Sequence, residues 1–102
     1  MQESAGVTSP KLDLEAFKAN PEAFTVVDIR NRSETENGKF FEHAITIPLH
    51  ELRERSSEIP TDKPIVVHCA GGYRSAAGSS VLETTLSQAT VYDLGDAVKD
   101  FQ

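Results

Sequence analysis

Four short apolar runs recur along the chain, separated by stretches of crossover length. In order they are FTVVDIR (24–30), AITIPL (44–49), PIVVHC (64–69) and ATVYDL (89–94). The first is rich in β-branched residues and ends in charge, which is typical of a strand buried on both faces of a parallel sheet. Strands that alternate with helices predict a small α/β fold, with a central parallel sheet flanked by helices.

Helices are expected before, between and after these strands. The first has Ser9 as its N-cap and Pro10 at its first position, and it ends before the next proline. Residues 30–39 are polar and contain an Asn-Gly pair, which predicts a loop. The other predicted helices are a short one within residues 49–59, one from Tyr73 to Leu86 with Gly78 as its weak point, and one that begins at Gly95.

Length and composition agree with a single domain. The chain has 102 residues, of which 38% are apolar and 25% charged, enough for one hydrophobic core. We expect residues 11–102 to form that domain. Residues 1–10 combine Ser, Gly, Thr and Pro without apolar periodicity and are expected to be a flexible leader or a linker remnant. We expect the domain to be a monomer.

Charge and cysteine content argue against several classes of protein. No apolar run approaches the roughly 20 residues of a membrane-spanning helix, and the first residues lack the basic and apolar parts of a signal peptide. A single cysteine cannot form an internal disulfide, which indicates a reducing compartment, and we expect a cytoplasmic protein. The net charge of −6 argues against a nucleic acid partner.

The only cysteine, Cys69, stands at the end of the third apolar run, and the sequence CAGGYRS continues from it into a predicted helix. In a parallel sheet, ligands bind at the carboxyl ends of the strands. Gly71 and Gly72 allow a loop that turns its N–H groups toward the sulfur, and the following helix adds the positive end of its dipole. The motif predicts an anion-binding loop with a thiol at its base.

Such a loop stabilises a thiolate, and Arg74 would add a full positive charge. We therefore expect a lowered pKa and a nucleophilic sulfur at Cys69. The same N–H groups can hold an incoming oxyanion donor or the charged outer sulfur of a persulfide. The alternative is an inert cysteine that merely ends a strand. The glycines, Arg74 and Ser75 in a strand-loop-helix context favour the reactive site.

Four segments, VVDIR, AITIPLHEL, IVVHCAGGYRSAAGS and VYDLGDAVKDF, together resemble a rhodanese domain, the single-domain sulfurtransferase module. The resemblance runs from about Leu12 to the end of the chain. It implies that Cys69 cycles between thiolate and persulfide without a cofactor, and that Asp28 and Arg30 match the supporting D-x-R strand end of the family. The substrate-binding loop residues are then Ala70, Gly71, Gly72, Tyr73, Arg74 and Ser75.

The chain departs from the family pattern in two places. FFEHAITIP lacks the common Gly-His-Ile stretch, and LGDAVKDF lacks a double glycine and a Trp. Val98 or Phe101 is expected to pack where that aromatic residue would lie. CAGGYRS also resembles rhodanese portions that accompany persulfide dioxygenases, which makes such a domain or protein a candidate partner and glutathione persulfide or thiosulfate the candidate small anionic donor.

Loop length separates two chemistries within this fold. Related phosphatases have the longer pattern CxxxxxR because phosphate is larger than a sulfane sulfur, whereas Cys69 to Arg74 reads CxxxxR. The leading hypothesis is a sulfurtransferase that moves a sulfane sulfur from thiosulfate or glutathione persulfide to a thiol or cyanide. The alternatives are a non-catalytic sulfur-binding or regulatory module and, less favoured, a small phosphatase.

Other polar residues have plainer expected roles. His43, His50 and His68 match no common ligand spacing, so we expect no metal site. His68 is expected to pack or to bond locally. Asp28 and Arg30 are expected to tie loops together by hydrogen bonds rather than to act as an acid and a base. The remaining expectations concern the loop itself, where Ser75 acts as N-cap or brace and Tyr73 shapes the entrance or covers the core.

Overall fold

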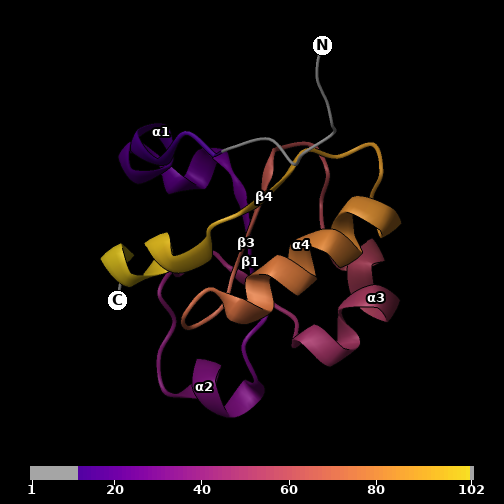
Figure 1. Cartoon of the computed structure of the whole chain (residues 1–102), viewed down its shortest axis with the longest axis horizontal. Helices are drawn as coiled ribbons and strands as arrows, with labels where there is room; N and C mark the ends of the chain where they lie inside the picture. The colour runs from indigo at the N-terminus through magenta and orange to yellow at the C-terminus, as the bar shows by residue number, and fades with distance from the viewer. Residues whose placement is uncertain (1–11, 102) are drawn as a thin grey trace.

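The computed structural model describes residues 12–101 of the chain. Its centre is a four-stranded sheet in the order β2-β1-β3-β4, and all neighbouring strands run parallel (Figure 1). The strands are β1 (Thr25–Asp28), β2 (Ile45–Thr46), β3 (Ile65–His68) and β4 (Val91–Asp93). The predicted parallel α/β fold and its four strands are confirmed.

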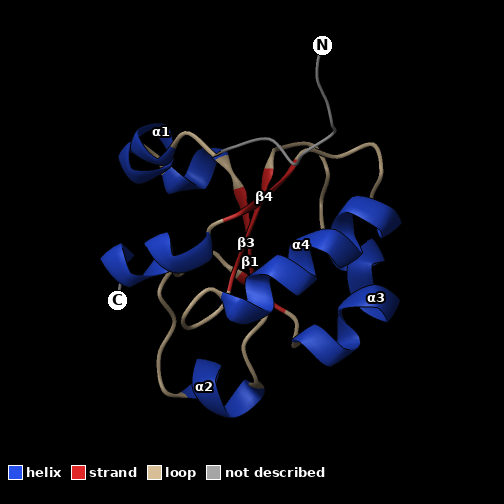
Figure 2. Ribbon diagram, in the orientation of Figure 1, coloured by secondary structure: helices blue, strands red, loops and turns tan. Residues whose placement is uncertain are grey.

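Helices cover both faces of this sheet (Figure 2). The α-helices are α1 (Leu14–Ala19), α2 (Arg32–Glu36), α3 (Leu52–Arg55) and α4 (Tyr73–Thr85), and the 3-10 helices are η2 (Pro21–Ala23), η3 (Leu49–Glu51), η4 (Ser56–Glu58) and η5 (Gly95–Phe101). One face carries α3 and α4, and the other carries α1 and η5. Between residues 12 and 101, no helix has both the length and the apolar character needed to cross a membrane.

The two central strands are buried along their whole length, as expected for strands covered on both faces. Val27 and Val67 belong to the hydrophobic cluster under α3 and α4, and Val26 and Val66 belong to the cluster under α1 and η5. Because side chains alternate along a strand, each strand contributes to both clusters. The carboxyl ends of β1 and β3 thereby lie side by side, with Asp28 opposite His68.

The last segment packs as the sequence predicts for a chain that lacks the tryptophan. Val98 is fully buried, and the Phe101 ring lies 5.0 Å from that of Phe41 and 5.5 Å from that of Phe17, measured between ring centroids. These apolar side chains hold η5 against the sheet, next to the loop that follows β3.

Helix α1 has a different N-cap from the one predicted. It begins at Leu14, and the Asp13 carboxylate accepts the Ala16 N–H at 3.2 Å. Asp caps a helix as well as Ser does, so both choices are chemically sound. Ser9, Pro10 and the expected leader at residues 1–10 lie outside the described residues.

The loop predicted for residues 30–39 is wrong in part, because it contains helix α2. The Glu34 carboxylate accepts the Asn31 N–H at 2.9 Å, which completes a capping box at the start of the helix. The polar composition was a poor guide because the helix has no buried residues and is held by polar contacts instead. Residues 37–39 are irregular, as predicted.

Gly78, the predicted weak point of α4, lies on the face of the helix that packs against the sheet. A Cβ atom at this position would come within 2.7 Å of Ile29 Cδ1 and 3.2 Å of Val67 Cγ1. The glycine therefore allows α4 to pack tightly on β1 and β3, which sets the position of the N-terminus of the helix beside Cys69.

Candidate active site

Cys69 follows β3 directly and lies at the N-terminus of α4, as the sequence predicts. Its sulfur accepts the N–H of Gly72 at 3.0 Å. The side chain is only 1% exposed and belongs to the hydrophobic cluster under α3 and α4, whereas Ala70, Gly71 and Gly72 of the loop are half-buried. The thiol thus lies at the base of a backbone loop, between the core and the partly exposed loop residues.

Gly72 is required by the shape of this loop. Its φ of +104° lies in the left-handed region that disfavours other residues. A Cβ atom there would lie 2.9 Å from both the backbone nitrogen of Asp96 and the carbonyl carbon of Gly95, which belong to η5. Both the turn and the close packing of η5 against the loop therefore depend on this glycine.

The environment of Cys69 lowers the pKa of its thiol. Burial is the largest influence and acts in the opposite direction, because it disfavours the charged form. The backbone N–H groups of Gly72, Ser75 and Gly71 outweigh burial because they stabilise the thiolate, and the Ser75 hydroxyl makes a smaller contribution in the same direction. The predicted lowering of the pKa is confirmed, and hydrogen bonds from the loop cause it.

Ser75 braces the loop but is not the N-cap of α4. The N-cap is Gly72, and Ser75 lies inside the first turn, fully buried. Its hydroxyl donates to the Gly72 carbonyl at 3.1 Å. Tyr73, by contrast, does not cover the core, because it is 91% exposed.

The guanidinium of Arg74 donates two hydrogen bonds to the carboxylate of Glu34 on α2. The two N–H···O distances are 2.7 and 3.0 Å. The hydrogen bonds from Arg74 lower the pKa of Glu34 to about 2, with a further contribution from the Asn31 N–H. The pKa of Arg74 is raised, chiefly by Glu34 and to a smaller degree by the charge on Cys69.

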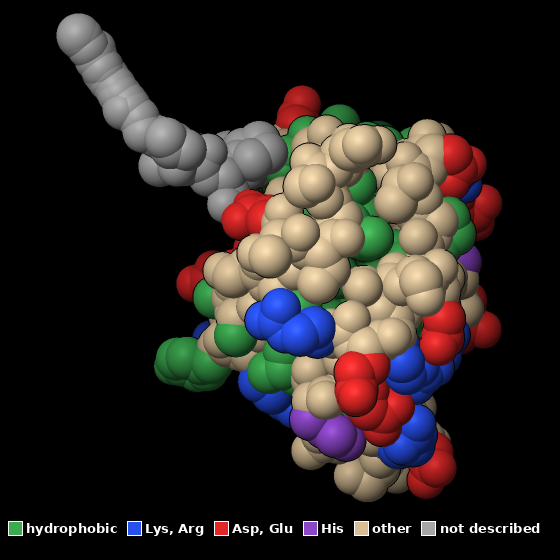
Figure 3. Space-filling view, turned by 90° about the vertical axis from the view of Figure 1, so that its right-hand side faces the viewer, with side chains coloured by type: hydrophobic (Ala, Val, Ile, Leu, Met, Phe, Trp, Pro, Cys, Tyr) green, Lys and Arg blue, Asp and Glu red, His purple; other side chains and the backbone are tan. Residues whose placement is uncertain are grey.

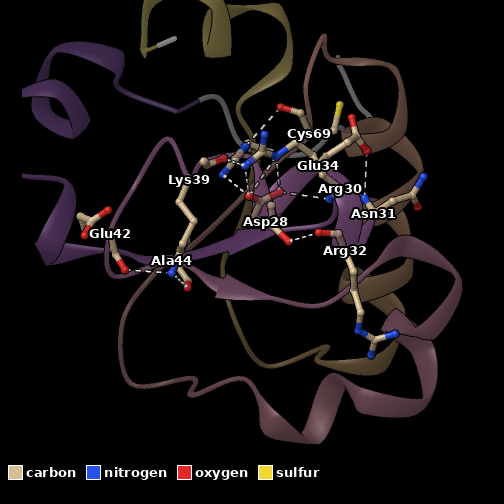
Figure 4. A network of polar contacts seen from close by, with 12 residues as sticks. Asp28, Arg30, Asn31, Arg32, Glu34, Lys39, Glu42, Ala44 and Cys69 are labelled. Carbon is tan, nitrogen blue, oxygen red and sulfur yellow. Dashed lines mark hydrogen bonds and ion pairs between the residues drawn. The ribbon is translucent and has the colours of Figure 1, made fainter.

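Glu34 is the residue near the site that sequence reasoning missed. The local signal was present, because N-R-S-E is a capping box pattern from Asn31 to Glu34. Its contact with Arg74 spans 40 positions in the sequence, which no local pattern reveals. Figure 4 draws Glu34 in one polar network with Asp28 and Arg30, with its carboxylate accepting the Asn31 N–H.

Asp28 and Arg30 form a buried pair at the end of β1, 0% and 5% exposed. The guanidinium donates to both carboxylate oxygens at 2.8 to 3.0 Å and to the Gly38 carbonyl at 2.9 Å. It also lies 4.1 Å from the centre of the Phe40 ring. The pair ties the α2 segment to the sheet, which agrees with the supporting role predicted for it.

His68 is buried beneath the loop and packs between the rings of Phe40 and Phe41, with centroids 5.6 and 5.1 Å away. Its Nδ1 lies 3.2 Å from the Cys69 carbonyl, so this nitrogen is the donor. Burial lowers the pKa of His68, although the Asp28 carboxylate 3.8 Å from Nε2 opposes that shift. His68 packs and bonds locally, as predicted.

The other histidines lie away from this site. His50 is exposed, with its Nε2 3.3 Å from a Glu51 carboxylate oxygen, and His43 contacts the Pro21 carbonyl. Within residues 12–101, no three His, Cys, Asp or Glu side chains gather in an arrangement able to hold a metal ion.

Comparisons with known proteins agree with the geometry. A sequence model of the family described as "Rhodanese-like domain" matches residues 13–102. A sulfurtransferase of Allochromatium vinosum is 39% identical over 57 residues, covering 56% of this chain and 52% of that protein. The chain spans about half the length of the curated relatives it matches.

Solved structures give the same result. The rhodanese-related protein of Thermoplasma volcanium is 35% identical, with a TM-score of 0.66 and coverage of 81% of this chain and 80% of that one. The NAD-dependent persulfide reductase of A. fulgidus is 34% identical, with a TM-score of 0.63, and the match covers 83% of this chain and 14% of that one. At the level of the family, these matches support sulfur transfer. The chain belongs to the rhodanese-like domain family.

Proposed function

We propose that the chain is a sulfurtransferase that carries a sulfane sulfur on Cys69, from thiosulfate or glutathione persulfide to a thiol or cyanide. The observation that supports this most is the 3.0 Å hydrogen bond from the Gly72 N–H to the Cys69 sulfur at the N-terminus of α4. A thiolate held there is a nucleophile, and the same loop suits the charge of a persulfide.

With thiosulfate, the first step is attack of the Cys69 thiolate on the outer sulfur. A new S–S bond forms, the S–S bond of thiosulfate breaks, and sulfite leaves with the bonding electrons. The Cys69 persulfide anion then accepts hydrogen bonds from the N–H groups of Gly71, Gly72 and Ser75, which already lower the thiol pKa. A thiolate or cyanide next attacks the outer sulfur, and Cys69 leaves as thiolate.

The supporting groups keep this loop in place. Ser75 fixes the Gly72 carbonyl, and His68 fixes the Cys69 carbonyl, so the peptide groups on either side of the sulfur are held in orientation. Asp28 and Arg30 anchor the neighbouring segment to β1. These roles need no cofactor.

The test compares wild-type protein with Cys69→Ser, using thiosulfate with cyanide and glutathione persulfide with a thiol. We expect transfer by the wild type and none by Cys69→Ser, with matching circular dichroism spectra showing that the fold is kept. Undiminished transfer by the serine variant would refute the proposal. Wild-type protein that forms no persulfide with any donor would favour the sulfur-binding or regulatory module instead.

The phosphatase alternative is disfavoured by the short CxxxxR loop and by the pairing of Arg74 with Glu34. A phosphate binds an arginine most tightly through two parallel N–H donors, and the Nη1 and Nη2 donors of Arg74 that form such a pair are already bonded to Glu34. Hydrolysis of a small aryl phosphate by the wild type would revive the phosphatase alternative.

As partner we propose a persulfide-handling protein such as a persulfide dioxygenase, since a domain similar to this one occurs in the A. fulgidus persulfide reductase.

A further inference from the structure

Arg30 at the end of β1 and Arg74 at the start of α4 are each paired with a carboxylate, and Figure 4 draws Arg30, Asp28 and Glu34 in one polar network. Arg30 is paired with Asp28 at 2.8 Å, and Arg74 is paired with Glu34 at 2.7 Å. The Asp28 pair is fully enclosed, whereas the side chains of Glu34 and Arg74 are 32% and 34% exposed. The second pair therefore lies where an incoming ligand can meet it.

Further ion pairs lie on the helices α2, η3 and α3. Arg32, on the same helix as Glu34, is held by Glu51 at 2.9 Å, and Glu51 also binds Arg55. On the face over α3 and α4, acidic and basic side chains lie next to one another along the lower edge (Figure 3). The positive contribution of the loop at Cys69 is then mainly the dipole of its N–H groups, equivalent to about half a charge.

This charge balance bears on which sulfur donor the site accepts. Thiosulfate carries two negative charges, and its reaction with the thiolate brings three negative charges together. A hydropersulfide, R–S–SH, carries at most one negative charge at its reacting end, and it reacts as an electrophile in its neutral, protonated form. Because the loop dipole is the main positive contribution at Cys69 and Arg74 is balanced by Glu34, the site favours the donor that adds the smaller negative charge.

We propose that Glu34 is a specificity-determining residue, which selects hydropersulfide donors over thiosulfate by neutralising Arg74 beside Cys69. This rests on the proposed sulfurtransferase function. The Cys69 thiolate attacks the terminal sulfur of R–S–SH, the S–S bond breaks, and RS⁻ leaves with the electron pair. Cys69 is oxidised to the persulfide level while the donor is reduced to a thiol, and the proton on the outer sulfur passes to solvent.

Glu34→Gln is a suitable test because it removes the charge and keeps the shape. Gln completes a capping box as Glu does, so α2 should remain capped at Asn31. Its side-chain oxygen can still accept one hydrogen bond from Arg74. Glu36→Gln is the matched control, because Glu36 is exposed on the same helix and loses the same formal charge.

The measurement is kcat/KM for thiosulfate and for glutathione persulfide in the wild type and both variants. Glu34→Gln should raise the value for thiosulfate on the order of tenfold, and the gain should shrink at high salt. The value for glutathione persulfide should change by less than about twofold, as should both values in Glu36→Gln. The inference is overturned if the ratio of kcat/KM for thiosulfate to that for glutathione persulfide is unchanged in Glu34→Gln, or if it changes equally in Glu34→Gln and Glu36→Gln. Either result leaves the proposed function unaffected.

A second readout needs no sulfur donor. The pH dependence of alkylation by iodoacetamide, a neutral reagent, reports the pKa of the Cys69 thiol. In Glu34→Gln this pKa should fall further, because the charge of Arg74 is no longer balanced. An unchanged pKa would overturn the electrostatic role of Glu34 whether or not the protein transfers sulfur. A wild type that transfers sulfur from neither donor instead refutes the proposed function.

Discussion

Replacing Gly72 by Ala should damage both the fold and the thiol. With φ at +104°, a side chain costs about 1–2 kcal/mol in backbone energy. The new Cβ would also lie 2.9 Å from backbone atoms of Gly95 and Asp96, and backbone cannot move aside as a flexible side chain can. Overpacking of this kind typically costs about 1–3 kcal/mol. We therefore expect a loss of about 3 kcal/mol in the free energy of unfolding.

Gly71→Ala is the matched control for this substitution. Gly71 has no positive φ, and a Cβ there would meet only the Tyr73 ring at 3.9 to 4.0 Å, which is ordinary contact. Its stability should change by no more than about 0.5 kcal/mol. Both variants keep the N–H groups of the loop, so a difference between them reports loop geometry alone.

The assays are urea unfolding and the pH dependence of Cys69 alkylation. In Gly72→Ala the displaced N–H no longer donates well to the sulfur, so the thiol pKa should rise toward its ordinary value of about 8.5. Alkylation near neutral pH should then slow. If Gly72→Ala unfolds at the same urea concentration as Gly71→Ala, or if the two thiols titrate alike, the assignment of the loop geometry is refuted.

Three further substitutions test separate parts of the structure by urea unfolding. Glu34 has a pKa of about 2 in the fold, so its contribution to stability, about 1 kcal/mol for a partly exposed pair, is present above the unfolded pKa of 4.5 and lost as pH falls toward 2. Glu34→Gln should therefore be less stable than the wild type above pH 4.5, and the difference between the two proteins should shrink as pH falls toward 2. Burial lowers the pKa of His68, so the wild type should lose stability as pH falls below about 6.5, and His68→Phe should remove that component; an identical pH dependence in the variant would contradict this. Gly78→Ala should destabilise by about 1 kcal/mol, because the contact at 2.7 Å from Ile29 outweighs the better helix propensity; a gain in stability would show that the helix has room to move away from the sheet.

The sheet could be predicted from sequence because its strands are local apolar runs. The prediction for residues 44–49 was longer than the strand, since β2 comprises only Ile45 and Thr46. The N–H groups of Ile47 and Leu49 nevertheless donate to the carbonyls of Asp28 and Ile29, respectively. The segment after β2 therefore continues to pair with the chain at the end of β1, outside the regular strand. The short helix within residues 49–59 is divided into η3, α3 and η4, a difference that apolar spacing does not encode.

The Cys69 loop was predictable for the same reason, because strand, glycines and helix are consecutive in the chain. What local sequence could not provide were contacts between distant segments. The approach of η5 to Gly72 depends on how the last segment packs, and the partner of Arg74 comes from a helix that composition did not predict. The positive charge expected from Arg74 is therefore present but balanced by Glu34. This balance is the reason for inferring a preference for hydropersulfide donors over thiosulfate.

The most direct test of the account is intact-protein mass spectrometry after treatment with glutathione persulfide. We expect a mass gain of one sulfur atom in the wild type, located on Cys69, lost on addition of cyanide and absent from Cys69→Ser. The reason is that the N–H groups around the sulfur stabilise an anion there. An unmodified Cys69 with every donor would contradict the account and would identify it as an inert cysteine that merely ends a buried strand.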